Sequence, residues 1–106
     1  MTGENRPWSD IWKEAAMDWV DKEAAAQLLE KTQSAIMAQK QAMLGDIPVN
    51  RAEQIVKASP DWYEHIKKVV EAKKVANAAW VDMEYYKMKY GEWNNEQANE
   101  RTEARL

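Results

Sequence analysis

The stretch SPDWYEHIKKVVEAKKVANAAWVDMEYYKMKY, Ser59–Tyr90, decides the fold that the sequence predicts. Its first three residues are typical of a helix start: serine caps the first turn, proline suits the first helical position, and a carboxylate favours the positive end of the helix dipole. The helical pattern continues across Gly91, at a cost of about 1 kcal/mol relative to alanine. We therefore predict a helix from Pro60 to about residue 101, roughly 60 Å long at 1.5 Å per residue.

This helix carries two apolar stripes, and one partner helix covers only one of them. The first stripe is interrupted by Lys73 and Lys87 and contains Trp62, Ile66, Val69, Ala76, Trp80, Met83, Tyr90 and Trp93. The second stripe, about 80–100° around the helix axis, contains Val70, Ala78, Val81, Tyr85 and Met88. Because monomers avoid contiguous exposed apolar patches, we predict that the second stripe is an interface covered by another molecule. The alternative is that a neighbouring short helix folds back over it.

Two further signals divide the chain upstream of this helix. Asn50 is suited to cap a short corner helix at 51–58, while Gly45 and Pro48 end the helix before it. We predict that this first helix runs over 9–44, with Ser9 as its N-cap. Its core-facing side chains follow alternating steps of three and four residues, interrupted by the polar Lys22, Gln33 and Lys40. They are Trp12, Ala15, Ala16, Trp19, Ala26, Leu29, Ile36 and Met43.

The size and composition of the chain favour one helical domain. It has 106 residues, of which 45% are hydrophobic and 31% charged, and it contains only three glycines and three prolines. We predict an all-α fold: a long antiparallel helical hairpin with a short corner helix, coiled-coil-like and oligomeric. A flexible leader at 1–8 precedes a single helical domain at 9–106, with helices at about 9–44, 51–58 and 60–101. Polar residues within the stripes would set register and subunit number, as in coiled coils.

Several classes of protein are excluded or disfavoured by what the sequence lacks. The absence of cysteine excludes disulfides, thiol nucleophiles and thiolate metal sites. The opening segment MTGENRPWSD lacks the apolar core of a signal peptide. No apolar run approaches the ~20 residues that cross a bilayer. We therefore predict a soluble, cytoplasmic protein without a membrane partner.

The aromatic residues and the charges both bear on partners. The chain has six tryptophans and four tyrosines but no phenylalanine. Tryptophan and tyrosine favour half-buried positions such as interfaces and ligand platforms, because each joins a large apolar surface to a polar tip.

The net charge of −3 argues against bulk nucleic-acid binding. Only residues 51–90 lean basic, with eight basic against six acidic side chains.

The residues that could carry chemistry form no recognisable catalytic set. His65 lies one turn after Asp61, but two ligands without a third make a poor metal site. No serine or threonine accompanies an evident base, and there is no glycine-rich phosphate loop. Most carboxylates lie three or four residues from a lysine, which is the spacing of solvated helical ion pairs. We predict no catalytic residue, no metal and no cofactor, although an enzyme stays an open alternative.

A group of lysines is the most informative charged feature of the chain. Lys67, Lys68, Lys73 and Lys74 lie close together on the predicted third helix, with few acidic neighbours. One interpretation is an ordinary solvated helix surface. The other is a phosphate-binding ridge, with Trp80, Tyr85 or Tyr86 as stacking surface for bases. One copy offers little charge, so the second interpretation needs an oligomer that repeats the ridge.

The segment VEAKKVANAAWVDMEYY resembles the central helix of the recombination mediators of tailed bacteriophages. There, an acidic residue, alanine, paired lysines and an alanine-rich run precede paired tyrosines. The closing GEWNNEQANERTEARL is similar to the ends of small helical proteins found among phage recombination genes, which close on tryptophan, a polar run and spaced arginines. The resemblance implies a helical oligomer that binds single-stranded DNA and helps to load a recombinase. It would make Lys67, Lys68, Lys73 and Lys74 the DNA-contacting residues.

Three functional hypotheses follow from these features. The first is a non-enzymatic, oligomeric helical accessory protein of phage-type DNA recombination or replication that binds single-stranded DNA. The second is a protein-only adaptor or assembly component, in which the apolar stripes bind partner helices and the lysines only contact solvent. The third is a small regulator that occupies a basic protein through its acidic N-terminal half, since residues 1–50 carry eight acidic and five basic side chains.

Overall fold

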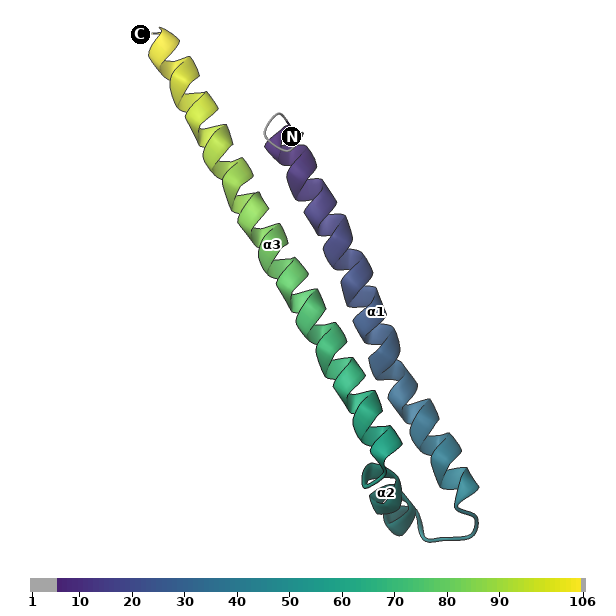
Figure 1. The fold of residues 1–106 in the computed structure, drawn as a ribbon. Helices are drawn as coiled ribbons and strands as arrows, with labels where there is room; N and C mark the ends of the chain where they lie inside the picture. Colours follow the sequence, from purple (N-terminus) through teal and green to yellow (C-terminus); the bar gives the residue numbers. More distant parts are fainter. Residues whose placement is uncertain (1–5, 106) are drawn as a thin grey trace. The chain divides into compact units, whose positions relative to one another are not determined.

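Three helices make up nearly all of the protein in the computed structural model, which describes residues 6–105 (Figure 1). They are α1, Trp8–Met43, of 36 residues; α2, Val49–Lys57, of 9 residues; and α3, Pro60–Arg105, of 46 residues. The described residues contain no strand, so the prediction of an all-α protein is confirmed. The leader predicted at 1–8 falls mostly on residues 1–5, which lie outside the described part.

The first two helices begin differently from the prediction. The Pro7 carbonyl accepts hydrogen bonds from the N–H groups of Asp10, at 3.1 Å, and Ile11, at 3.2 Å, so Ser9 lies inside the first turn and does not cap α1. At α2 the Pro48 carbonyl accepts from the Ala52 N–H at 3.0 Å, and no side chain caps the helix. The prediction of Asn50 as the cap is therefore wrong. In both places the chain turns into the helix directly after a proline.

The other two helix ends agree with the sequence signals. The Trp62 N–H donates to Ser59 Oγ at 3.3 Å, which confirms the serine as the cap of α3. Gly45 follows α1 with a φ of 79°, and its N–H donates to the Ala42 carbonyl at 3.3 Å. This is the left-handed conformation that glycine adopts at the lowest cost. As predicted, α3 continues across Gly91, and it extends four residues beyond the predicted end at 101.

The chain forms two compact units, and both long helices run through each of them. One unit contains α1 from Lys22 on, α2, and α3 as far as Val75. Within it, Lys40 Nζ lies 3.2 Å from Asp61 Oδ2, and Lys73 forms an ion pair with Glu30. Since the later residue of α1 pairs with the earlier residue of α3, the helices are antiparallel here. Figure 1 shows α2 and the preceding loop at the turn between them.

The other unit contains α1 up to Asp21 and α3 from Ala76 on. One aromatic pair joins its two helices, and a third ring, also on α3, extends the stack. The centroids of Trp12 and Tyr90 are 5.7 Å apart with nearly parallel planes, and Trp93 stacks on Tyr90 at 6.4 Å. These distances lie within the range of favourable aromatic pairs. Part of the tryptophan and tyrosine content therefore serves packing within the chain.

The interior of the described chain is built from small side chains. Its buried residues are Ala26, Ala52, Val56, Val69, Ala76 and Ala79. Alanines allow two helix backbones to approach closely, because the distance between helix axes depends on the side chains at the contact. Since buried apolar area is the main stabilising term, the described residues of one chain supply only a modest amount of it.

The face of α3 that turns toward α1 is partly different from the predicted stripe. Its buried and half-buried residues recur at alternating steps of three and four residues and include Trp62, His65, Val69, Ala72, Ala76, Ala79, Met83, Tyr86 and Tyr90. We call this face the inner seam. The predicted stripe shared Trp62, Val69, Ala76, Met83 and Tyr90, but it placed Trp80 where the structure has Ala79. Trp80 is 47% exposed, so its predicted packing position is wrong.

The predicted stripe of α1 agrees better with the structure. Trp12, Ala15, Trp19, Leu29 and Ile36 are half-buried, and Ala26 is buried. Met43, at the end of the helix, is 84% exposed and does not belong to the packed face. None of the helices in the described chain is both long enough and apolar enough to cross a membrane.

Candidate functional site on the third helix

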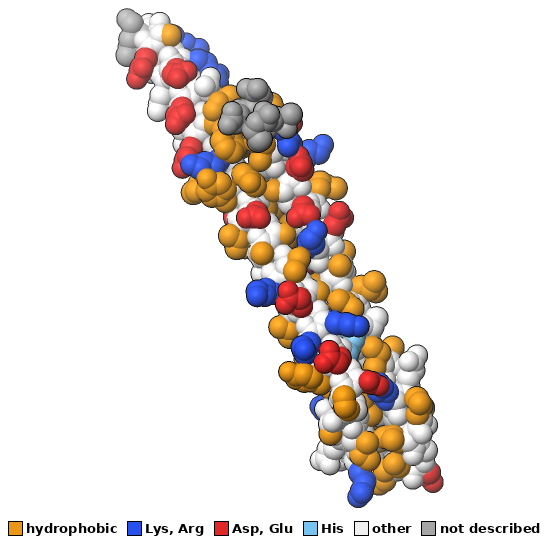
Figure 2. All heavy atoms as spheres, viewed as in Figure 1, with side chains coloured by type: hydrophobic (Ala, Val, Ile, Leu, Met, Phe, Trp, Pro, Cys, Tyr) orange, Lys and Arg blue, Asp and Glu red, His pale blue; other side chains and the backbone are white. Residues whose placement is uncertain are grey.

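The second apolar stripe of α3 is exposed along its whole length. We call it the outer stripe, and it consists of Val70, Ala78, Val81, Tyr85 and Met88. Val81 and Met88 each lie two residues before a residue of the inner seam, and two residues turn a helix by about 200°. The outer stripe therefore lies nearly opposite the inner seam rather than beside it. Figure 2 shows hydrophobic side chains reaching the surface among the charged ones on the face it presents.

The exposure of Val70 shows whether the corner helix folds back over this part of the outer stripe. Val70 belongs to the same unit as the corner helix α2, yet it is 60% exposed. The corner helix therefore does not cover Val70. The apolar side chains that α2 buries, Ala52 and Val56, belong to the small core of its own unit.

Two of the four predicted phosphate-binding lysines have acidic partners. Lys73 forms an ion pair with Glu30 of α1. Lys67 Nζ lies 3.7 Å from Glu64 Oε1 and 5.5 Å from the centre of the Tyr63 ring. Both contacts are exposed, where an ion pair contributes little to stability. They nevertheless lower the positive charge that the cluster presents to a polyanion.

The remaining two lysines, Lys68 and Lys74, have no ion-pair partner among the described residues. Lys68 lines a shallow groove between α1 and α3 in its unit, beside Lys22 and Glu71. Lys68 and Lys73 are five residues apart in a helix, which places them about 140° from each other around the axis. Lys67 and Lys74, seven residues apart, share one face of α3, and Lys68 and Lys73 lie on either side of it. The four lysines therefore spread around much of the helix instead of forming one narrow ridge.

The three rings proposed for base stacking differ in how exposed they are. Tyr85 is exposed, and Lys89 Nζ lies 5.6 Å from its centre. Tyr86 is half-buried in the inner seam, with its ring edge-on to Tyr85 at 5.4 Å between centroids. Trp80 is exposed on a flank of α3. Only Trp80 and Tyr85 therefore present enough ring surface for stacking.

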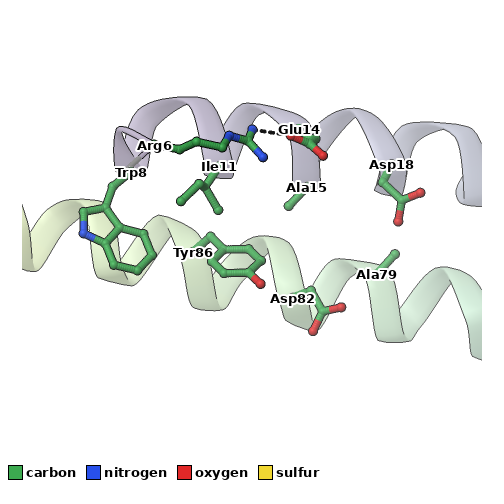
Figure 3. Close-up of a pocket in the computed structure, with 9 residues that line it drawn as sticks. All are labelled: Arg6, Trp8, Ile11, Glu14, Ala15, Asp18, Ala79, Asp82 and Tyr86. Atoms are coloured by element: carbon green, nitrogen blue, oxygen red, sulfur yellow. Dashed lines mark hydrogen bonds and ion pairs between the residues drawn. The ribbon is translucent and has the colours of Figure 1, made fainter. Parts of the chain in front are cut away.

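A groove between α1 and α3 in the unit of the aromatic stack was not predicted from the sequence. Figure 3 shows Ile11 and Ala15 of α1 facing Tyr86 and Ala79 of α3, with Trp8 at one end. Its polar lining residues are Arg6, Glu14, Asp18 and Asp82, and Arg6 forms an ion pair with Glu14. The signal that could have found it is the three-to-four spacing of Trp8, Ile11 and Ala15 on one side of α1. Among the described residues, no group of three possible ligands could hold a metal ion.

His65 and Asp61 do not form a pair. Asp61 is exposed and contacts Lys40, with 3.2 Å between Oδ2 and Nζ. His65 belongs to the inner seam, where its ring centroid lies 6.0 Å from that of Trp62. Its Nε2 is buried and is the one such side-chain atom in the described chain without a hydrogen-bond partner. The histidine is therefore part of the packing between the helices.

Comparisons of the chain with protein families, with curated proteins and with solved structures find no match. The function proposed for this chain therefore rests on its own residues. The outer stripe and the exposed lysines of α3 are the two surfaces that offer one.

Proposed function

We propose that this chain is a non-catalytic helical accessory protein that works as a self-associated assembly, with the outer stripe of α3 as its interface. The observation that carries the proposal is the exposure of Val70, Val81, Tyr85 and Met88 on the side of a 46-residue helix that faces away from its partner helix. Exposed apolar side chains gathered on one side of a helix mark an interaction site in a water-exposed protein.

The small interior supports the same proposal. Four alanines and two valines are buried in the described chain, whereas fourteen large hydrophobic side chains are exposed. Association with a second molecule removes apolar surface from water, and each buried square ångström contributes about 25 cal/mol. A partner that binds only the folded state also raises its stability by mass action. An assembly would therefore supply burial that the single chain lacks.

Sedimentation velocity over a wide concentration range tests this proposal. We expect the wild type to sediment as a dimer or larger species at micromolar concentration, and Val81→Glu to sediment as a monomer because a charge in a buried interface lacks a partner. Asn94→Glu is the matched control, since it adds the same charge at an exposed position of α3 outside the outer stripe. Circular dichroism of both variants shows whether they keep their helices.

A wild type that is monomeric at all concentrations would contradict self-association. It would also favour the protein-only adaptor, in which a different protein covers the outer stripe. Loss of association in Asn94→Glu as well as in Val81→Glu would place the interface elsewhere.

Binding of single-stranded DNA is the second candidate function, and the exposed lysines Lys68 and Lys74 favour it because no carboxylate in the described chain pairs with them. Together with the resemblance to phage recombination mediators, this supports a role in loading a recombinase onto DNA. Lys73 is the weakest member of the predicted set, since Glu30 already neutralises it. Trp80, which is exposed and lies outside the outer stripe, would provide the stacking surface in an assembly that covers Tyr85.

Fluorescence anisotropy of a labelled oligonucleotide tests DNA binding. If the wild type binds, log K should fall linearly with log salt concentration, with a slope of about −0.7 for each neutralised phosphate. Lys67→Glu combined with Lys68→Glu should weaken binding strongly, whereas Lys31→Glu, an exposed change on α1, should have a small effect. The absence of any binding by the wild type at low salt would exclude this function.

A further inference from the structure

We propose that a second copy of this chain covers the outer stripe, with the two α3 helices antiparallel and Val81 of each copy opposite Tyr85 of the other. The inference rests on the proposed self-association and specifies its geometry. It follows from three features of α3: the spacing of the exposed apolar residues, the charges that flank them and the sizes of their side chains.

The spacing is that of a coiled-coil interface. Ala78, Val81, Tyr85 and Met88 are exposed and follow one another at steps of three, four and three residues. This alternation keeps side chains on one seam of a helix that pairs with another helix. The same steps lead to Lys74 before the apolar residues and to Glu92 after them. The outer face of α3 therefore holds an apolar centre with a basic residue at one end and an acidic residue at the other.

The flanking charges select the antiparallel orientation. In antiparallel pairing Lys74 of each copy lies opposite Glu92 of the other, so the dimer gains two ion pairs. In parallel pairing Lys74 faces Lys74 and Glu92 faces Glu92, which places like charges together at both ends. Glu92 Oε2 lies 3.5 Å from Lys89 Nζ within its own chain. That contact is a weak exposed pair, so the carboxylate stays able to turn toward a second lysine.

Side-chain size favours the same orientation. Antiparallel pairing sets Ala78 opposite Met88 and Val81 opposite Tyr85, so a small side chain meets a large one in every layer. Parallel pairing would set alanine against alanine and tyrosine against tyrosine, and the separation of the helices would have to change between layers. Interfaces in which large and small residues alternate across facing positions pack more evenly.

Like charges at the edges of this interface weaken the proposed dimer. Asp82 and Glu84 flank the centre of the stripe. Across the two-fold axis, each would lie near the same residue of the other copy. Asp82 is exposed to solvent, where water and salt screen the repulsion between like charges. The four apolar residues in the seam are also few. We therefore expect a dimer of moderate, micromolar affinity rather than a permanent one.

The proposed dimer also bears on the lysine cluster. Lys74, which would pair with Glu92 of the second copy, would lose its role as a free phosphate contact. Lys67 and Lys68 lie outside the paired stretch, and in a dimer they would occur twice, toward its two ends. Variants of Lys67 and Lys68 therefore test DNA binding without changing the seam.

Cysteine cross-linking tests the orientation and register directly, because the natural chain contains no cysteine. Val81→Cys and Tyr85→Cys are prepared as separate proteins, one of them with a size tag, and oxidised alone and as a mixture. The antiparallel register brings residue 81 of one copy opposite residue 85 of the other, so the mixture should form a mixed disulfide rapidly. Each variant alone should cross-link about tenfold more slowly, because a disulfide requires Cα atoms within about 7 Å.

The possible outcomes separate this inference from the function on which it rests. Faster cross-linking of Val81→Cys with itself would show a parallel dimer and overturn the inference, while self-association would stand. A dimer by sedimentation without cross-linking in any mixture would place the interface elsewhere and also overturn it. A wild type that sediments only as a monomer would contradict both.

A charge exchange provides an independent test by sedimentation. Lys74→Glu and Glu92→Lys should each weaken dimer formation by about tenfold, and the double variant should restore it. Lys67→Glu is the matched control, because the residue opposite it in this register is the neutral Asn99. Failure of the double variant to recover, when both single variants weaken the dimer, would contradict the proposed pairing.

Discussion

Two glycines illustrate how the backbone decides what a residue contributes. Gly91 lies within α3, and a Cβ added there would meet no atom within 4 Å. Gly45 has the same free space but a φ of +79°, which side chains other than hydrogen rarely adopt. We predict that Gly91→Ala raises the free energy of unfolding by about 1 kcal/mol, and that Gly45→Ala lowers it by about 1–2 kcal/mol. Urea unfolding followed by circular dichroism measures both, and equal effects of the two changes would contradict this explanation.

Two tryptophans provide a second contrast at the scale of residues. Trp12 stacks on Tyr90 with 5.7 Å between ring centroids, whereas Trp80 is 47% exposed. Removing a packed tryptophan costs about 3–5 kcal/mol, and we expect about 2–3 kcal/mol for Trp12→Ala because its ring is half-buried. Trp80→Ala should change stability by less than about 1 kcal/mol. Thermal unfolding of the two variants side by side is the measurement, and a larger loss for Trp80→Ala would mean that this ring is buried in the assembly.

At the scale of elements, the contact between α1 and α3 depends on alanine. Ala26 is 2% exposed in the unit that contains α2, while Ala24 on the same helix is exposed. Ala26→Leu inserts three carbon atoms into a packed contact and should destabilise the protein by about 1–3 kcal/mol. Ala24→Leu is the control, and it should be close to neutral because both residues are strong helix formers. Similar unfolding midpoints for the two variants would show that the contact adapts to a larger side chain.

The packed face of α3 also shows how far sequence reasoning reached for this element. Trp62, Val69, Ala76, Met83 and Tyr90 recur every seven residues and were placed correctly. Between them, a residue three or four positions along fits the helical period equally well. The predicted stripe used the larger Trp80, whereas the structure uses Ala79. Large apolar side chains therefore misled the prediction at a contact that small side chains form.

At the scale of the whole molecule, self-association should make stability depend on concentration. Binding of a second copy to the folded chain alone raises the melting temperature as the protein concentration increases. We predict such a rise for the wild type over a hundredfold concentration range, and none for Val81→Asp. Differential scanning calorimetry measures both. A melting temperature of the wild type that does not change with concentration would contradict an obligatory link between assembly and stability.

The two candidate surfaces differ in how well the sequence predicted them. The outer stripe was proposed with all five of its residues, and they are exposed on one side of α3. The four lysines were proposed as one cluster, but Lys73 contacts Glu30, a residue that lies more than forty positions earlier in the chain. Such a contact depends on how α1 and α3 align within their unit. It therefore could not be derived from the helix that carries the lysine.

The sequence by itself determined where most of the helices of this protein lie and how two of their ends form. The cap at Ser59 and the left-handed Gly45 involve only residues within three or four positions, so local chemistry is sufficient for them. Only the tertiary structure decided which side of α3 meets α1 and which lysines have partners. The reason is physical: alternating steps of three and four residues fit both a seam through Trp80 and a neighbouring seam through Ala79. The choice between them depends on how closely the backbone of the other helix can approach.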